Sequence, residues 1–284
     1  MVKHKLTVGS LFAGIGGFEL GFEATGRFET RWQVECDAYA TKVLEKHWPD
    51  VQRHDDVCTW PNETTQPVDV IIGGFPCQDI SYAGKGAGLD GKRSGLFYEL
   101  VRIVRVVGPR YIVLENVAAL FTRGMDQVLG SLASHGYDAE WEVVSAASVG
   151  APHRRDRVFI IGYAADSDSF GERENVKRHV VQSGATRPAV SHQFMESGNV
   201  ADAISKQREG CEQKTVSRES RLSQQLRRGC ADQREQWAIE PDVGRLANGV
   251  PNRVHRLRCL GNAIVPQVAQ VVAERLLEIH EANA

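Results

Sequence analysis

The chain has 284 residues, of which 42% are hydrophobic and 25% charged, enough to bury one sizeable core and a smaller appendage. Its formal net charge of −2 at pH 7 argues against a uniformly basic nucleic-acid binder but leaves a local basic patch open. The six cysteines form no CxxC pair, so we expect neither a disulfide framework nor a metal site. No apolar run is long enough for a membrane span or an export signal, which predicts a cytoplasmic protein.

Up to about residue 163, short runs rich in Val and Ile alternate with longer segments of helical spacing. The predicted strands cover residues 6–12, 30–35, 68–73, 110–115, 139–145 and 157–163. The predicted helices cover residues 17–25, 38–47, 96–107 and 125–135. This alternation is typical of βαβ units around a mostly parallel sheet, and it predicts a doubly wound, Rossmann-like α/β fold.

The composition changes after residue 164. Large apolar residues become sparse as far as about residue 236, and Ser, Gln, Arg and Glu dominate. Residues 173–234 hold twelve Lys or Arg against seven Asp or Glu, an excess of five positive charges. Such a segment suits contact with phosphates, but a solvated or disordered insert has the same composition, and the sequence leaves both open.

The last part of the sequence returns to helical spacing after a predicted Gly-Asn turn at residues 261–262. Apolar residues recur there at the positions of one helix face: Val265, Val268, Ala269, Val272, Leu276 and Ile279. This pattern predicts a closing helix that packs back on the sheet.

The stretch LFAGIGGFELGFE, residues 11–23, follows the first predicted strand and opens the first helix. Its glycines at 14, 16 and 17 let the backbone approach a ligand closely, beside the positive end of a helix dipole. The third glycine of a dinucleotide fingerprint would fall at Glu19, so a pyrophosphate fits poorly. A nucleoside such as S-adenosylmethionine fits better, with Phe12 against the adenine. A glycine-rich turn without a ligand is the alternative.

Two carboxylates follow at positions that suit a nucleoside pocket. Glu35 ends the second strand, where an acidic residue commonly binds the ribose hydroxyls of an adenosine cofactor. Asp56 lies beyond the next helix and is expected to accept a hydrogen bond from the adenine amino group. Either alone would be interpreted as a surface carboxylate, but together with the glycine loop they favour a nucleoside pocket.

A candidate nucleophile, Cys77, follows the third predicted strand in GGFPCQDIS. The carboxyl edge of an open α/β sheet is where such folds place their active sites. Pro76 before it and the Gly-, Lys- and Arg-rich loop of residues 78–96 after it suit an exposed thiol and a segment that closes over a substrate. An inert buried thiol is the alternative. Glu115, in YIVLENV, ends another strand and brings a carboxyl group to the same edge.

Five motifs occur in a fixed order along the chain: FAGIGG, PCQ, ENV, RRDRVFIIG and GNAIVP. Together they resemble the DNA cytosine-5 methyltransferase family, over about residues 6–163 and 244–280. The resemblance implies a Rossmann-like, S-adenosylmethionine-dependent methyltransferase fold in three parts. Residues 1–163 would form the catalytic and cofactor-binding domain, residues 164–243 a small target-recognition insert, and residues 244–284 a segment that completes the catalytic domain.

The resemblance also assigns roles to single residues. Cys77 would add to carbon 6 of a flipped-out cytosine, with the loop after it as a clamp. Glu115 would hold the ring at N3 and the exocyclic amine, and Arg155 and Arg157 would contact the base. The S-adenosylmethionine pocket would be lined by Phe12, Gly14, Gly16, Gly17, Glu35, Asp56, Val57, Pro76, Leu96 and Asn262. Double-stranded DNA is the implied partner of a monomer, with either a cognate restriction endonuclease beside it or an orphan or phage role.

Three residues depart from the pattern of that family. Ser10 stands where the family often has Asp, His153 where a Gln usually precedes the Arg pair, and Cys36 where a large apolar residue is common; these bear on cofactor affinity and on contacts near the base.

A tRNA cytosine-5 methyltransferase would carry a CFT element, which is not found. A silent DNA-binding paralogue would lack the cysteine or glutamate, and a nicotinamide oxidoreductase would need the third glycine.

Overall fold

The structure is a computed structural model that describes residues 4–76, 95–164 and 251–283. Its strands are β1 (Leu6–Leu11), β2 (Phe28–Val34), β3 (Gln52–His54), β4 (Val70–Gly74), β5 (Tyr111–Val117), β6 (Tyr137–Ser145) and β7 (Asp156–Ala164). Its helices are α1 (Gly17–Ala24), α2 (Ala38–His47), α3 (Gly95–Val107), α4 (Leu120–Arg123), α5 (Met125–Ser134), the 3-10 helix η2 (Ala146–Val149), α7 (Arg253–Asn262) and α8 (Pro266–Ala282). The described residues belong to one compact unit.

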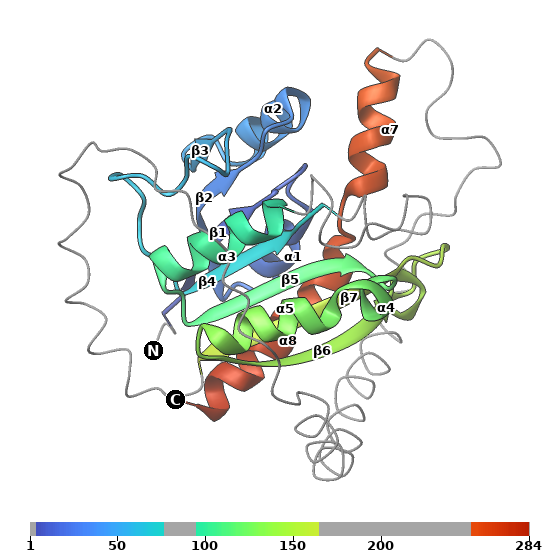
Figure 1. Ribbon diagram of the computed structural model, residues 1–284. Helices are drawn as coiled ribbons and strands as arrows, with labels where there is room; N and C mark the ends of the chain where they lie inside the picture. Colours follow the sequence, from blue (N-terminus) through green and yellow to red (C-terminus); the bar gives the residue numbers. More distant parts are fainter. Residues whose placement is uncertain (1–3, 77–94, 165–250, 284) are drawn as a thin grey trace. The chain divides into compact units, whose positions relative to one another are not determined.

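The strands form one seven-stranded sheet in the order β3-β2-β1-β4-β5-β7-β6 (Figure 1). The neighbours from β3 to β5 pair in parallel, and β7 runs antiparallel to both β5 and β6. The chain moves outward from β1 to β3 and then returns to β4 on the other side of β1. The carboxyl ends of β1 and β4 therefore form the topological switch point, where doubly wound folds bind their ligands.

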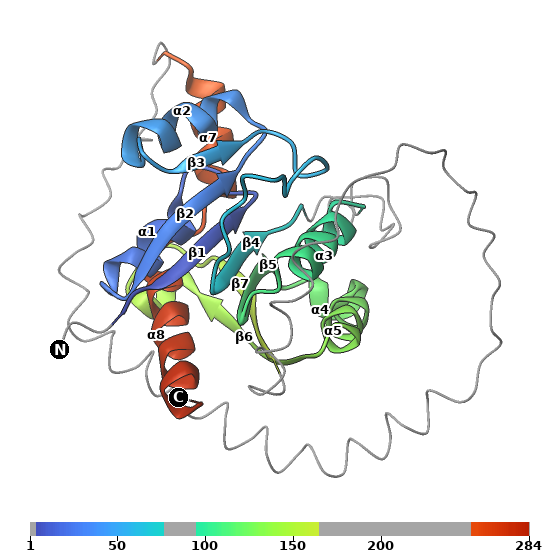
Figure 2. The ribbon, with the colours of Figure 1, turned by 90° about the vertical axis from the view of Figure 1, so that its left-hand side faces the viewer.

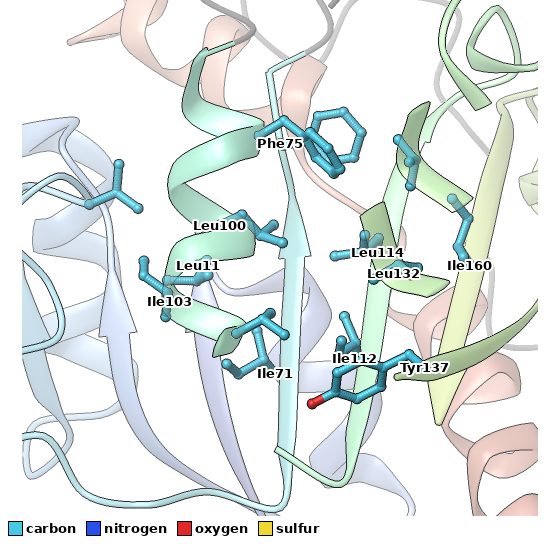
Figure 3. Close-up of a cluster of buried hydrophobic side chains, with 14 of the residues drawn as sticks. Leu11, Ile71, Phe75, Leu100, Ile103, Ile112, Leu114, Leu132, Tyr137 and Ile160 are labelled. Atoms are coloured by element: carbon cyan, nitrogen blue, oxygen red, sulfur yellow. The ribbon is translucent and has the colours of Figure 1, made fainter. Parts of the chain in front are cut away.

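Helices cover both faces of the sheet. Figure 2 shows α3 and α5 on one side and α1 and α8 on the other. On the first side, Ile71 of β4 and Leu114 of β5 share a buried cluster with Leu100 of α3 and Leu132 of α5 (Figure 3). Side chains alternate along a strand, and accordingly Tyr111 of β5 points the other way, with its hydroxyl 3.1 Å from His280 Nδ1 on α8.

The structure confirms the predicted α/β fold, and every predicted strand and helix before residue 164 lies within two residues of an observed one. Three short elements, β3, α4 and η2, were not predicted. Each has at most four residues, too few to show a periodic pattern. The predicted Gly-Asn turn is wrong, because Gly261 and Asn262 form the last turn of α7 and the chain turns at residues 263–265. None of the residues of α7 is buried, and its large apolar side chains Val254, Leu257 and Leu260 are exposed.

The described residues contain neither a helix suited to a membrane nor a cluster of metal ligands. None of their helices combines the length and apolar character needed to cross a membrane. No group of three or more His, Cys, Asp or Glu side chains among them is arranged to hold a metal ion. Residues 77–94 and 165–250 lie outside the described part of the chain, and with them lie Cys77, nearly all of the predicted clamp loop, and the predicted insert.

Candidate active site

The loop after β1 has an unusual backbone. Phe12 has φ of 56°, Gly14 58° and Gly16 87°, all in the left-handed region that favours glycine. For Phe12 this conformation costs of order 1–3 kcal/mol, a cost that clusters at functional sites. A Cβ built on Gly14 meets no atom within 4 Å. Space for a ligand therefore lies directly beside the backbone of this loop.

The next two glycines have a different role from the one that the sequence suggested. A Cβ on Gly16 would lie 2.3 Å from the Trp48 ring, and one on Gly17 would lie 2.3 Å from the carbonyl oxygen of Ile264. These glycines admit close approach of other parts of the chain. Gly17 thus brings the segment that precedes α8 against the start of α1.

Glu35, which follows β2, holds the glycine loop in place. Its Oε2 accepts a 2.7 Å hydrogen bond from the Gly14 N–H, and its Oε1 accepts one of 2.7 Å from the Asp37 N–H. Asp37 in turn caps α2 by accepting from the N–H groups of Tyr39 and Ala40, which lowers the pKa of its carboxyl group. A carboxylate has about four acceptor positions, so Glu35 keeps capacity for further donors.

A pocket of about 250 Å³ opens beside Glu35, and its lining consists of Glu35, Thr41, Arg53, His54 and Asp55. The sequence did not single out the last four. Of the residues that it did, Asp56 is exposed and its Oδ1 accepts from the Cys58 N–H at 2.9 Å. Val57 is buried in the main cluster. The structure thus brings Glu35 to this pocket and leaves Asp56 and Val57 outside its lining.

The remaining predicted pocket residues lie at the same edge of the sheet or on α7. Phe12 and Leu96 are half-buried, and both pack against the main cluster. Pro76 is half-buried two residues after β4. Asn262 is exposed at the end of α7. No contact in the described residues joins Asn262 to Glu35, so their shared role in one pocket stays a prediction.

Glu115 and Arg157 form an ion pair at the carboxyl end of β5. Glu115 lies opposite Phe159 in the register of β5 and β7, and Arg157, two residues away on β7, is its diagonal neighbour on the same face. Arg157 Nε lies 2.9 Å from Glu115 Oε1. The Glu115 residue is 9% exposed. Burial raises its pKa from 4.5 to about 7, against the charges of Arg157 and Arg155, which lower it.

The carboxyl group of Glu115 also lies over the end of β4. Gly74 is its partner in the register of β4 and β5, and a Cβ on Gly74 would lie 2.9 Å from Glu115 Oε2. A side chain at position 74 would therefore displace this carboxyl group. Cys77 follows Gly74 by three residues in the sequence, so the carboxyl group is held close to the point where the chain leads to the candidate nucleophile.

Asn116 is the second residue of the ENV motif, and the sequence assigned it no role. It is 2% exposed, and its Nδ2 donates to the Phe75 carbonyl oxygen at 3.3 Å. Its Oδ1 accepts from the Val117 N–H at 2.8 Å. Asn116 therefore ties the end of β5 to the backbone just before Pro76. The sequence pattern that could have revealed this role is a polar residue at the end of an apolar strand, because a buried polar side chain needs a hydrogen-bond partner.

Arg155 lies in the loop before β7 and points to the C-terminal helices. Its Nη2 donates to the carbonyl oxygens of Gly261 and Ala263, at 2.8 and 2.9 Å. Burial lowers the pKa of its guanidinium, and the charge of Arg157 lowers it further. Two of the three arginines of the RRDR motif thus have separate partners: Arg157 pairs with the buried Glu115 carboxyl group, and Arg155 binds the backbone at the end of α7.

A doubly wound sheet with a glycine loop after β1 and a buried carboxyl group at the end of β5 is a Rossmann-like arrangement. The family model described as C-5 cytosine-specific DNA methylase matches residues 6–238. This match covers most of the sequence, so the chain belongs to that family.

Several curated proteins are similar to this chain. The Type II methyltransferase M.Bsp6I of Bacillus sp. (strain RFL6) is 37% identical over 166 residues, which cover 56% of this chain and 52% of the relative. M.Sau3AI of Staphylococcus aureus is 36% identical over 57% of this chain and 44% of its own. The chain thus spans about half the length of these relatives. The chain is also similar to the crystal structure of S. pombe Dnmt2 methyltransferase, with 18% sequence identity and a TM-score of 0.49. The match covers 63% of this chain and 57% of that chain.

Proposed function

We propose that this protein transfers a methyl group from S-adenosylmethionine to carbon 5 of a flipped-out cytosine in a specific double-stranded DNA sequence. The observation that carries the proposal is the buried Glu115–Arg157 ion pair. Its carboxyl group lies against Gly74, which ends β4 at the switch point of the sheet and precedes Cys77 by three residues in the sequence. Membership of the C-5 cytosine-specific DNA methylase family supports it, as does the likeness to Type II methyltransferases.

The residues around the glycine loop fit the methyl donor. There is open space at Gly14, a pocket beside Glu35, and free acceptor capacity on the Glu35 carboxylate for ribose hydroxyls. S-adenosylmethionine, when bound, supplies an activated methyl group on its sulfonium. The protein's part at this end of the site is to orient that group toward the edge where β4 and β5 end.

The residues at the cytosine end have complementary tasks. Carbon 5 of cytosine is a poor nucleophile, so the Cys77 thiolate adds to carbon 6 and makes carbon 5 electron-rich. A protonated Glu115 donates to N3 and accepts from the exocyclic amine, which stabilises the charge that develops on the ring. Its pKa of about 7 makes that proton available near neutral pH. Once carbon 5 has taken the methyl group, transfer of its proton to a base restores the double bond between carbons 5 and 6 and expels the Cys77 thiolate from carbon 6.

The test is transfer of labelled methyl groups to a plasmid, with modified cytosines mapped at single-base resolution. Modified cytosines confined to one short motif are expected from the wild-type protein. Cys77→Ala should bind S-adenosylmethionine and transfer nothing. Turnover by Cys77→Ala would overturn the nucleophile assignment, and transfer to tRNA but not to DNA would overturn the substrate.

The partners follow the same proposal. We expect a monomer in the cytoplasm that binds duplex DNA, with residues 164–243 as the target-recognition part. A cognate restriction endonuclease would make it one half of a restriction-modification pair. Challenge of plasmid methylated by this protein with a panel of endonucleases tests that point, because protection from one enzyme identifies the shared recognition sequence.

A further inference from the structure

The junction between α7 and α8, residues 261–265, is held from two sides. On one side, the Arg155 guanidinium donates to the carbonyl oxygens of Gly261 and Ala263. On the other, Gly17 lies so close that a Cβ would be 2.3 Å from the Ile264 oxygen. The junction therefore lies between the loop that carries Arg155 and the start of α1, where the glycine loop ends.

Apolar packing does not anchor helix α7. None of its residues is buried, so apolar packing contributes little. Its side-chain contacts include a 5.6 Å ring stack between His255 and Tyr39 and an ion pair of 3.6 Å between Arg258 and Asp37, with the Arg258 side chain 66% exposed. An exposed pair of this kind contributes at most about 1 kcal/mol. The last carbonyl groups of a helix need donors, and Arg155 supplies one to Gly261.

Helix α8 is held differently. It packs on α1 so closely that a Cβ on Gly21 would lie 2.5 Å from the Ala269 Cβ, and residues such as Val272 and Leu276 are fully buried. Loss of Arg155 should therefore release α7 and the junction while α8 stays in place. Figure 1 shows the two helices following one another, with α8 against the sheet.

We propose that Arg155 is a positioning residue: it clamps the α7–α8 junction against the glycine loop and so completes the S-adenosylmethionine site, while Arg157 alone serves the base. This rests on the proposed function, and it changes the role that the sequence suggested for Arg155. Both hydrogens of its Nη2 are used by backbone carbonyls. The clamp links the cofactor half of the site to the loop that leads into the Glu115–Arg157 pair.

The test compares wild type, Arg155→Ala, Arg155→Lys and the adjacent control Arg154→Ala, whose side chain is exposed and pairs with Asp156. Hydrogen exchange is followed in residues 253–265, with α8 as the internal reference. Arg155→Ala should speed exchange in the first segment and leave α8 unchanged. Lysine has no planar fork to bind two carbonyls at once, so Arg155→Lys should lie between. Arg154→Ala should match wild type.

A second measurement separates clamping from base contact. If the clamp is released, fewer molecules hold a complete site, and the Kd and KM for S-adenosylmethionine should rise at least about fivefold. The kcat at saturating S-adenosylmethionine should stay within about twofold of wild type, as expected when only binding is lost. Unchanged exchange in residues 253–265 of Arg155→Ala, or a lost kcat with unchanged cofactor affinity, would overturn the proposal. A wild-type protein that binds no S-adenosylmethionine would refute the proposed function, while the exchange experiment would still test the clamp.

Discussion

Arg157 Nε lies 2.9 Å from Glu115 Oε1, and the carboxyl group of that pair lies in turn against Gly74. Two strands that run in opposite directions, β5 and β7, thus place a cation beside a buried carboxyl group whose pKa is about 7. Burial favours the protonated form and the arginine favours the ionised form. The balance leaves a group that exchanges its proton near neutral pH.

Arg157→Ala should change the pKa of Glu115. Without the guanidinium, the pKa of Glu115 rises above 7, because the charge of Arg157 is the largest effect opposing burial. If a protonated Glu115 donates to N3, the pH at which kcat/KM declines on the alkaline side should move up by about one unit or more. The overall rate should also fall, by about 10²-fold. The measurement is the pH dependence of methyl transfer between pH 5.5 and 9.5.

The matched control for that variant is Arg31→Ala, which removes the exposed Arg31–Glu29 pair on β2. Its pH profile should overlay that of the wild type. An Arg157→Ala profile that keeps the wild-type shape would show that Glu115 does not control the rate through its proton.

The buried carboxyl group of Glu19 should make the free energy of unfolding depend on pH. Glu19 is fully buried on α1, its Oε1 accepts from Gln33 Nε2 at 3.1 Å, and burial raises its pKa from 4.5 to about 7. Between those two values, the unfolded chain releases the proton while the folded protein keeps it. The free energy of unfolding therefore falls as the pH rises from 4.5 to 7, by about 3 kcal/mol in all for this group.

Glu19→Gln should remove the fall in the free energy of unfolding that Glu19 causes as the pH rises. Relative to wild type, the variant should gain stability between pH 5 and pH 8 by up to about 3 kcal/mol, as measured by urea unfolding at the two pH values. Glu45→Gln, an exposed change on α2, should show no such gain. A difference between Glu19→Gln and wild type that is the same at both pH values would contradict the pKa assigned to Glu19.

The close approach at Gly17 can be tested with a single methyl group. In Gly17→Ala, the new Cβ would collide with a backbone oxygen that has no side-chain freedom to move away, at a cost of about 1–3 kcal/mol. In Gly130→Ala on the exposed side of α5, the Cβ meets nothing within 4 Å, and the better helix propensity should add about 0.5–1 kcal/mol. Urea unfolding of both variants checks the opposite signs, and equal effects would argue against contact between Gly17 and Ile264.

The proposed DNA contact predicts a strong dependence on salt. Residues 173–234 carry an excess of five positive charges, and each phosphate contact releases counterions. The logarithm of the association constant should therefore fall with the logarithm of salt concentration, with a slope of about −0.9 per phosphate contact. Filter binding between 50 and 300 mM NaCl gives the slope. A flat response would contradict phosphate contact by this segment.

Much of the fold could be predicted because its signals are local. The strands β4 and β5 are apolar runs, and α2 begins at the capping residue Asp37. Helix α7 could not be predicted, since it buries nothing and is held by polar contacts with residues more than 100 positions away. Glu115 and Arg157 were both predicted as site residues, but only the antiparallel register of β5 and β7 shows that they pair. That register is long-range information, which neither composition nor periodicity contains.

The roles of the glycines show the same limit. Gly14, Gly16 and Gly17 were all expected to serve a ligand. The open side of Gly14 is consistent with that use, whereas Gly16 and Gly17 accommodate Trp48 and Ile264. The glycines in this loop indicate that other atoms approach the backbone closely. Only the folded chain shows whether those atoms belong to a ligand or to another part of the protein.

The contact between Gly17 and Ile264 also sets an order of events during synthesis. The ribosome makes the glycine loop almost 250 residues before the segment that packs against it. At about 5–20 residues per second, this delay is on the order of tens of seconds. Throughout that time the nascent chain has the first half of its cofactor loop and not the segment that closes it. We therefore expect the growing chain to acquire cofactor affinity only after residues 261–266 have left the ribosome.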